Sequence, residues 1–190
     1  MNPALALENL RVTSEEIDWL RGNCSYLPDA YLDFLSGFRV YPQKQVTLEW
    51  NEQSQDLSIL MHGRWIDTIL YEIPVLALVS EAYFRFVDTD WDYVGQYGTP
   101  SEIATRMLTF IERAFCKAER LIRGGCVFSE FGSRRRRDYH THDLVIQGLL
   151  AASKALDGPG RLQGTSNVHF AIKYNLTPIG TVAHEVPLIS

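Results

Sequence analysis

The chain has 190 residues, of which 46% are hydrophobic and 12% aromatic, and its formal net charge is −5 at pH 7. This length and composition are typical of a globular protein with a full core, which excludes a disordered chain. The acidic balance argues against a general nucleic-acid binder, because such proteins are usually basic. We therefore expect no nucleic-acid partner.

Compartment and membrane signals point to the cytoplasm. The three cysteines are an odd number without metal-ligand spacing, which indicates reduced thiols. The apolar N-terminal stretch has no basic region before it and ends at Glu8, so we predict no signal peptide. The most apolar stretch, 73–79, is too short for a membrane span. We expect no membrane association and a cytoplasmic location, with the nucleus as an alternative.

The first part of the chain predicts two helices followed by a hairpin. Thr13, with glutamates directly after Ser14, is typical of a capped helix start. The stretch 28–35 begins with proline and is followed by glycine, which suits a short helix. Two β-rich stretches, 38–50 and 57–65, are joined by a polar segment and predict a β-hairpin.

Two longer helices are expected next. Residues 69–87 are strongly apolar over a helical length, and Pro74 is tolerable there because it lies near the start. A second helix is predicted after Thr99, because apolar side chains recur there every three or four residues. Thr99 is the predicted cap of this helix. Gly124 and Gly125 are expected to end this helix.

After Gly125, short apolar strands alternate with helices. Short connections in the order βαβαβ indicate a parallel sheet or a (β/α) barrel. We therefore predict an α/β protein: an N-terminal α+β segment over 1–124, followed over 125–190 by the first three βα units of an incomplete (β/α) barrel. The strands and helices expected after Gly125 are, in chain order, 127–131, 143–156, 162–165, 166–174 and 178–183.

The carboxyl ends of the three predicted strands are rich in polar and charged residues. The first strand ends at Phe131 and is followed by the run Arg134–Arg137, the second is followed by Ser166, and the third ends near Thr181 and His184. In parallel α/β folds, reactive groups gather at this edge of the sheet. The sequence therefore predicts one site built from all three strand ends.

The four consecutive arginines have two interpretations. A charge run is usually a solvated basic surface. Directly after a buried strand, however, arginine side chains can hold phosphate oxygens, with each such bond contributing about 1.5–3 kcal/mol. In an acidic protein this position favours a small phosphorylated ligand. The spacing leaves open which of the guanidinium groups face that ligand.

The histidines also leave alternatives open. His184 is either a satisfied core residue or a neutral imidazole able to act as a nucleophile, for example toward a phosphoryl group. His140 and His142 are spaced as a metal pair would be, but no third ligand is evident nearby. The start of a helix ahead of Asp143 is the favoured interpretation of these two histidines. We predict no metal site in the chain.

Four stretches together resemble nicotinate phosphoribosyltransferases, particularly those of the fungal type, within a similarity that runs from about Thr13 to Glu185. The resemblance implies an incomplete barrel beside an α/β domain. It also implies an enzyme of NAD salvage that joins nicotinate to phosphoribosyl pyrophosphate, with ATP and Mg²⁺ as further requirements and a homodimer as the full-length assembly. The four stretches are Asp67–Pro74, Phe128–Arg137, Gly164–Asn167 and Pro178–Glu185.

The resemblance assigns roles to particular residues. His184 falls on the histidine that ATP phosphorylates, and Phe131 on the aromatic that stacks on the pyridine ring. Arg134 and Arg136 fall on arginines that hold the phosphates of the ribosyl donor. Thr181 falls among the polar contacts to the pyridine substituent. These assignments are what membership in the family implies for this sequence.

Ser166 indicates which pyridine the site would accept. In the similar nicotinamide enzymes, the resemblance places aspartate here, where it accepts hydrogen bonds from the amide. An aspartate about 4 Å from the nicotinate carboxylate would cost about 4 kcal/mol at an effective dielectric of about 20. Serine can instead donate a hydrogen bond to that carboxylate. Ser166 therefore favours the acid over the amide.

The resemblance also implies segments that this sequence lacks. One is an N-terminal Asp-x-Tyr-Lys motif, and the others follow His184 in the family, including further strands and a glycine-rich phosphate loop. We therefore expect an internal piece of such an enzyme that is inactive alone. One alternative is a non-catalytic fragment that interacts with or regulates the full-length enzyme. The other is a small phosphate-binding module.

Overall fold

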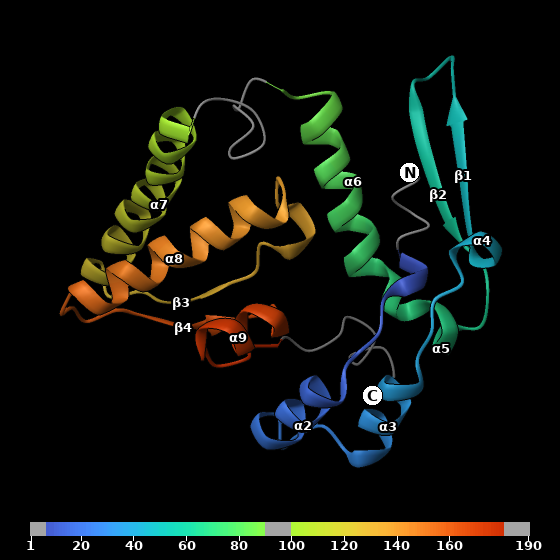
Figure 1. Cartoon of the computed structure of the whole chain (residues 1–190), viewed down its shortest axis with the longest axis horizontal. Coiled ribbons are helices and arrows are strands. Elements are labelled where there is room, and N and C mark those ends of the chain that lie inside the picture. Colours follow the sequence, from blue (N-terminus) through green and yellow to red (C-terminus); the bar gives the residue numbers. More distant parts are fainter. Residues whose placement is uncertain (1–6, 90–99, 181–190) are drawn as a thin grey trace. The chain divides into compact units, whose positions relative to one another are not determined.

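The computed structural model describes residues 7–89 and 100–180 (Figure 1). The chain divides into two compact units, which we call unit 1 (1–87) and unit 2 (88–190). In the part of the chain that the structure describes, both units contain helices together with a two-stranded sheet, so the protein is of mixed helix and strand structure. Within the described ranges, no helix is long and apolar enough to cross a membrane.

Unit 1 begins with the two predicted short helices. The Thr13 hydroxyl accepts a hydrogen bond from the Glu16 amide at 3.2 Å, and the Glu16 carboxylate accepts one from the Thr13 amide at 2.8 Å. This reciprocal cap confirms the predicted helix start, because it satisfies two amides that the helix leaves unpaired. Leu20 and Leu32 are buried between the helices. The elements are η1 (Leu7–Asn9), α2 (Ser14–Asn23) and α3 (Asp29–Gly37).

The predicted hairpin is present, but its strands are shorter than expected. A helical turn, α4 (Pro42–Gln45), precedes β1 (Val46–Asn51), which pairs antiparallel with β2 (Asp56–Met61). The expectation of a strand over 38–50 was therefore wrong at its start. Proline at the first position of α4 is pre-organised for a helical turn, and the Tyr41 amide before it donates to the Tyr71 hydroxyl at 2.8 Å.

The rest of unit 1 is helical. Residues 65–68 form α5 (Trp65–Thr68), so the second predicted strand also ended too late. A 3₁₀ turn, η2 (Ile69–Tyr71), leads into α6 (Glu72–Phe86), in which Pro74 lies in the first turn as predicted. Tyr71 and Val75 are buried in the core of this unit. Val79 and Phe86 of α6, with Trp50 of the hairpin, line an open apolar groove of about 760 Å³.

Unit 2 is built around two helices, α7 (Pro100–Arg123) and α8 (Tyr139–Ala155). As predicted, α7 ends at Gly124, and Gly125 follows with φ of +78°, a conformation that glycine adopts without strain. The helices pack closely at Gly148, where an added Cβ would lie 2.4 Å from the Ile111 carbonyl oxygen. Thr99, the predicted cap of α7, lies outside the described residues.

Two parallel strands lie against these helices, β3 (Val127–Glu130) and β4 (Arg161–Thr165), with α8 as the crossover between them (Figure 1). Phe128 and Leu162 of the two strands pack on the core formed by α7 and α8. The register shifts once: Phe128 pairs with Leu162 and Ser129 with Gly164, so Gln163 has no partner in β3. This confirms the first βαβ unit of the prediction.

The helix after β4 is α9 (Val168–Tyr174). Both α8 and α9 differ from the predicted starts because a side chain caps each of them. The Asp138 carboxylate accepts from the Thr141 amide at 2.5 Å, so α8 begins four residues before the predicted Asp143. The Asn167 side chain accepts from the Phe170 amide at 3.1 Å, so α9 begins at Val168 instead of residue 166.

The third predicted strand is described only at its beginning. Thr165 forms a parallel bridge with Pro178, in which its amide donates to the Thr177 carbonyl at 3.1 Å and its carbonyl accepts from the Ile179 amide at 2.9 Å. Residues 181–183 lie outside the described ranges. The division into domains at residue 124 stays a prediction; α7, which precedes it, packs within unit 2.

Candidate functional site

The carboxyl ends of β3 and β4 lie next to each other. In the parallel register Glu130 pairs with Thr165, so Phe131 and Ser166 are the first residues beyond the paired strands. The Ser166 amide donates to the Glu130 carbonyl oxygen at 2.9 Å, which holds the two strand ends together. Two of the chain segments that the sequence assigns to a site therefore meet at one edge of the sheet.

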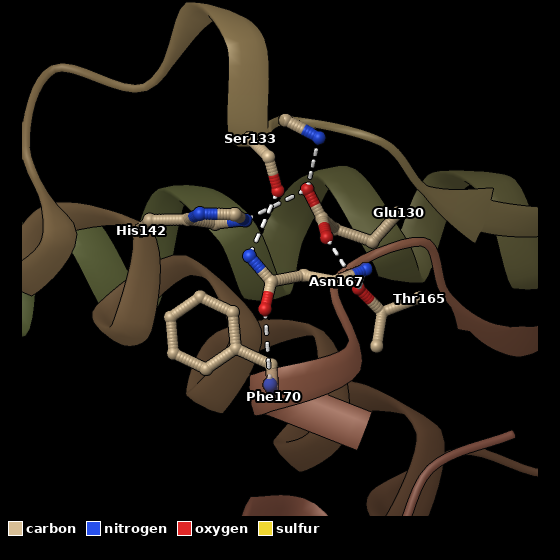
Figure 2. Close-up of polar contacts among 7 residues, drawn as sticks. Glu130, Ser133, His142, Thr165, Asn167 and Phe170 are labelled. Atoms are coloured by element: carbon tan, nitrogen blue, oxygen red, sulfur yellow. Dashed lines mark hydrogen bonds and ion pairs between the residues drawn. The ribbon is translucent and has the colours of Figure 1, made fainter. Parts of the chain in front are cut away.

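The Glu130 carboxylate is the centre of a buried polar network at this edge (Figure 2). One oxygen, Oε1, accepts hydrogen bonds from the Gly132 amide and from Nε2 of His142, the latter at 2.9 Å. The other, Oε2, accepts from the Thr165 hydroxyl at 2.7 Å. The carboxylate thus joins the end of β3, the end of β4 and the first turn of α8.

These hydrogen bonds keep Glu130 ionised. Burial raises the pKa of the Glu130 carboxyl. The hydrogen bonds from His142, Thr165 and Gly132 lower this pKa by more than burial raises it, so it lies below its ordinary value. An ionised carboxylate only accepts hydrogen bonds, which requires a proton on Nε2 of His142. The His142 ring also packs edge-on against Phe170, with ring centroids 4.7 Å apart.

Asn167 extends the network to the arginine segment. Its side-chain amide donates to the Ser133 hydroxyl at 2.8 Å, while its side-chain oxygen caps α9 at the Phe170 amide (Figure 2). Its backbone amide donates to the Thr165 hydroxyl at 3.1 Å. The turn that carries the arginines is therefore fixed to the segment that carries Ser166.

The arginines lie in and after a single 3₁₀ turn, η3 (Ser133–Arg135). Arg134 is exposed, and the Arg136 guanidinium lies 5.8 Å from the centre of the Tyr139 ring. The Phe131 side chain is 49% exposed. An aromatic face and a cationic turn are thus both open to solvent beside the strand ends, an arrangement suited to a planar ring and to phosphate oxygens.

A second polar cluster ties α8 to α9. The Asp143 carboxylate accepts from the Lys173 ammonium at 2.7 Å and from the Tyr174 hydroxyl at 2.8 Å. Burial raises the pKa of the Asp143 carboxyl, but these bonds lower it below its ordinary value. The Tyr139 hydroxyl is 2.7 Å from Nε2 of His169 on α9. This cluster joins α8 to α9, and the Phe170 ring packs against both Tyr139 of this cluster and His142 of the Glu130 network.

The outcome for the predicted site residues is mixed. Phe131 and Ser166 directly follow the paired ends of β3 and β4, and Arg134 and Arg136 are in the turn after β3. Thr181 and His184 lie outside the described residues. His140 and His142 lie in the first turn of α8, as the favoured interpretation expected. Within residues 7–89 and 100–180, no three His, Cys, Asp or Glu side chains are grouped as metal ligands.

Sequence reasoning missed the network that holds the site. Glu130 carried a signal, because it is a charged residue at the end of a short apolar strand, two positions after Phe128 and hence on the same face. A carboxylate on a buried face needs partners. The identity of those partners, His142 and Thr165, depends on the register of the sheet and on the start of α8, which the sequence alone does not give.

Two family descriptions match the chain. Residues 4–80 match the nicotinate phosphoribosyltransferase (NAPRTase) N-terminal domain, and residues 126–187 match the nicotinate phosphoribosyltransferase (NAPRTase) family. These two matches fall on either side of the long helix α7 and belong to one family.

Individual relatives agree with both matches. A protein of Schizosaccharomyces pombe, named as a probable nicotinate phosphoribosyltransferase, is 49% identical over 179 residues, which are 94% of this chain and 40% of that protein. The nicotinate phosphoribosyltransferase of Saccharomyces cerevisiae is 46% identical over 208 residues, 93% of this chain and 44% of that protein. The chain therefore spans less than half the length of these curated relatives.

Solved structures show the same fold. A crystal structure from Saccharomyces cerevisiae superposes with a TM-score of 0.80 at 44% identity and covers 96% of this chain and 42% of that one. The nicotinate phosphoribosyltransferase structure from Porphyromonas gingivalis gives a TM-score of 0.76 at 33% identity, covering 96% and 41%.

Proposed function

Because the chain belongs to the nicotinate phosphoribosyltransferase family, we propose that it contributes to the transfer of a phosphoribosyl group to nicotinate. In this reaction the pyridine nitrogen forms a bond to the anomeric carbon of phosphoribosyl pyrophosphate, and pyrophosphate leaves with the bonding electrons. The products are nicotinate mononucleotide and pyrophosphate. The observation that best supports the proposal is the pairing of Glu130 with Thr165, because the segments that begin with Phe131 and Ser166 then share one edge.

Nicotinate would bind between these two segments. The half-exposed ring of Phe131 offers a face on which the flat pyridine can stack. The Ser166 hydroxyl can donate a hydrogen bond to the nicotinate carboxylate, and no negative charge at this position repels it. Thr181 is proposed as a further polar contact to the same substituent. Together these residues would select the acid over the amide.

The phosphates of the ribosyl donor would bind to the arginine turn. Arg134 and Arg136 offer planar groups that can donate two parallel hydrogen bonds to phosphate oxygens. The Tyr139 ring, 5.8 Å from the Arg136 guanidinium, limits the directions in which that side chain can point. Holding the donor beside the bound pyridine would place the two reacting groups next to each other, which removes the entropy cost of bringing them together for the transfer.

Mg²⁺ would reach this site together with phosphate. Protein Mg²⁺ sites usually use one or two carboxylates with substrate phosphates. The Glu130 carboxylate, which is bonded to the Gly132 amide just before the arginine turn, is buried and already accepts three hydrogen bonds. The residues at this edge therefore suit phosphate oxygens better than a bare cation. When bound with the phosphates, Mg²⁺ would neutralise part of their negative charge.

ATP is proposed as the second phosphate substrate, with His184 as the phosphoryl acceptor. A ring nitrogen of His184 would bond to the terminal phosphorus of ATP as ADP leaves, and later hydrolysis would return the histidine. We further propose that the βαβ unit of β3, α8 and β4 is the first part of an incomplete (β/α) barrel, and that the full-length protein is a homodimer.

The proposal can be tested by calorimetric titration of the chain with phosphoribosyl pyrophosphate in the presence of Mg²⁺. Arg134→Ala is expected to weaken binding by about 10–100-fold, the loss expected for charge-assisted hydrogen bonds. Arg120→Ala on α7 is the matched control, because it removes the same charge from an exposed position away from the strand ends. Equal effects of the two substitutions, or no binding to the unmodified chain, would contradict the proposal.

A second candidate is a non-catalytic partner of a full-length enzyme of the same family. It is favoured by the apolar groove of unit 1, which leaves the rings of Trp50 and Phe86 exposed. A synthesis assay separates the two candidates. Nicotinate mononucleotide formed from nicotinate, phosphoribosyl pyrophosphate and ATP by the purified chain would contradict a purely non-catalytic role.

A further inference from the structure

Glu130 is the point at which the two segments of the candidate site are joined. Its carboxylate accepts from the Gly132 amide, at the start of the arginine turn, and from the Thr165 hydroxyl, directly before Ser166. Its backbone carbonyl accepts from the Ser166 amide at 2.9 Å. Phe131 lies between Glu130 and Gly132 in the chain, so both of its neighbours are fixed.

The side chain of Glu130 itself is not available to a ligand. It is buried, and both of its carboxylate oxygens are occupied by donors from within unit 2. It therefore acts on the exposed residues through the backbone and through Thr165. A group of this kind influences binding by fixing the geometry of others.

The helices of unit 2 do not depend on this network for their packing. Leu144, Ile146 and Leu149 of α8 are buried apolar side chains that take no part in the Glu130 hydrogen bonds. The helix α8 is also joined to α9 by the hydrogen bond from Lys173 to Asp143. Loss of a Glu130 hydrogen bond is therefore expected to loosen the segments 131–137 and 165–168 while α7 and α8 stay folded. Local opening of this kind is common where few apolar contacts hold a segment.

We infer that Glu130 is a positioning residue, which sets the arginine turn and Phe131 at a fixed distance from Ser166 so that one ligand can contact all of them. This inference rests on the proposed function, since the ligand it serves is phosphoribosyl pyrophosphate beside nicotinate. His142 completes the arrangement by donating to the same carboxylate from α8, which anchors the joined segments to the helical core.

Substitutions at Thr165 test the inference without changing a residue that faces the ligand. Thr165→Val keeps the shape of this fully buried side chain but removes the hydroxyl that donates to Glu130 and accepts from the Asn167 amide. Thr165→Ser keeps the hydroxyl and loses only a methyl group. Asp143→Asn is the control for weakening another hydrogen-bonded carboxylate of unit 2. Glu130→Gln is a second test, because its amide keeps the shape but has only one acceptor oxygen, which cannot serve both the Thr165 hydroxyl on one side and the Gly132 and His142 donors on the other.

Two measurements are made on the 190-residue chain and on each variant of it: amide hydrogen exchange of 131–137 and 165–168, and calorimetric affinity for phosphoribosyl pyrophosphate with Mg²⁺. Thr165→Val and Glu130→Gln are expected to speed exchange in both segments by about tenfold and to weaken binding by a similar factor. Thr165→Ser and Asp143→Asn should stay within about threefold of the unmodified chain in both measurements.

The outcomes separate the inference from the proposed function. Unchanged exchange and affinity in Thr165→Val and Glu130→Gln would overturn the positioning role. Equal losses in Thr165→Ser and Asp143→Asn would also overturn it, because the effect would then be general destabilisation. Failure of the unmodified chain to bind phosphoribosyl pyrophosphate would contradict the proposed function, and the exchange rates alone would then decide whether Glu130 holds the two segments.

Discussion

The Thr165 hydroxyl donates a hydrogen bond of 2.7 Å to the Glu130 carboxylate, across two parallel strands and 35 positions of sequence. Both residues are the last of their strands, so the bond closes the sheet where the candidate site begins. Glu130 also accepts from Gly132 and His142, so a change to any one partner should alter the hydrogen bonds that the other partners make to this carboxylate.

Gly132→Ala is expected to destabilise unit 2 by about 1–3 kcal/mol, the usual cost of overpacking. The backbone at Gly132 has φ of −81°, which any residue adopts, so strain of the main chain is not the cause. An added Cβ would lie 2.6 Å from Oε1 of Glu130 and push the carboxylate away. Urea unfolding followed by circular dichroism measures the loss.

Gly22→Ala provides the control for this substitution. Nothing lies within 4 Å of a Cβ added at Gly22, which is inside α2, so alanine should stabilise that helix by about 0.5–1 kcal/mol. A Gly132→Ala chain as stable as the unmodified protein would mean that the carboxylate has room to move.

The stability of unit 2 should fall in acid because of Glu130. Its pKa is lowered in the folded protein by its hydrogen bonds, against the effect of burial, relative to an ordinary value of 4.5. A group with a lowered folded pKa stabilises the fold above its unfolded pKa, and this contribution is lost as the pH falls through the folded pKa. We therefore expect the free energy of unfolding to decrease below about pH 5.

Glu130→Gln isolates this contribution. The variant should be less stable than the unmodified chain at pH 7, and the difference should shrink as the pH falls, because the glutamine does not titrate. Asp143→Asn should show a separate acid-dependent difference of the same sign, since the Asp143 pKa is also lowered. A difference between Glu130→Gln and the unmodified chain that is constant from pH 7 to about pH 3 would contradict the assignment.

Ser166→Asp should weaken nicotinate binding by about two to three orders of magnitude if the side chain faces the pyridine substituent. The reason is repulsion between two carboxylates at short distance. Nicotinamide, which carries no charge, should be affected much less. Calorimetric titration with each pyridine measures the ratio of the two losses, and equal losses would show that Ser166 does not contact this substituent.

The groove of unit 1 should bind dyes that report apolar surface. It is lined almost entirely by apolar side chains, and Trp50 and Phe86 are 54% and 73% exposed. Replacing both by glutamine should lower the fluorescence of bound anilinonaphthalene sulfonate at least about twofold, with little loss of stability because neither ring is buried. Fluorescence unchanged by the double substitution would place the dye elsewhere.

Local signals in the sequence predicted much of the fold. Thr13 with Glu16 marked a helix start, and Gly124 with Gly125 marked a helix end, because these residues satisfy or release backbone groups within one turn. Predictions were wrong where a short motif competed with a longer pattern. The stretch 38–50 was predicted as a strand from its β-rich composition, but it contains the helical turn that begins at Pro42. The side-chain caps at Asp138 and Asn167 make α8 and α9 begin at other residues than predicted.

The candidate site was predictable only in part for a similar reason. Strand ends rich in Arg and Ser pointed to the edge at which β3 and β4 end side by side, since strand ends can be read from hydrophobic runs. The Glu130 network could not be read in the same way, because it depends on which residue of β4 lies opposite Glu130. That register is decided by packing of both strands on α7 and α8, an interaction between distant parts of the sequence.

Gln163, which has no partner in β3, changes which side of the sheet the last residues of β4 face. Leu162 faces the helical core, and in a regular strand Thr165, three positions later, would face the opposite side. The register shift turns Thr165 back to the side of Glu130. Deleting Gln163 would therefore remove the bulge and leave Thr165 two positions after Leu162, so that a regular strand would present Thr165 on the same side as Glu130. Such a chain should keep its far-ultraviolet circular dichroism and exchange the amides of 131–137 as slowly as the unmodified chain, so β4 is expected to tolerate the loss of the one residue that has no partner in β3.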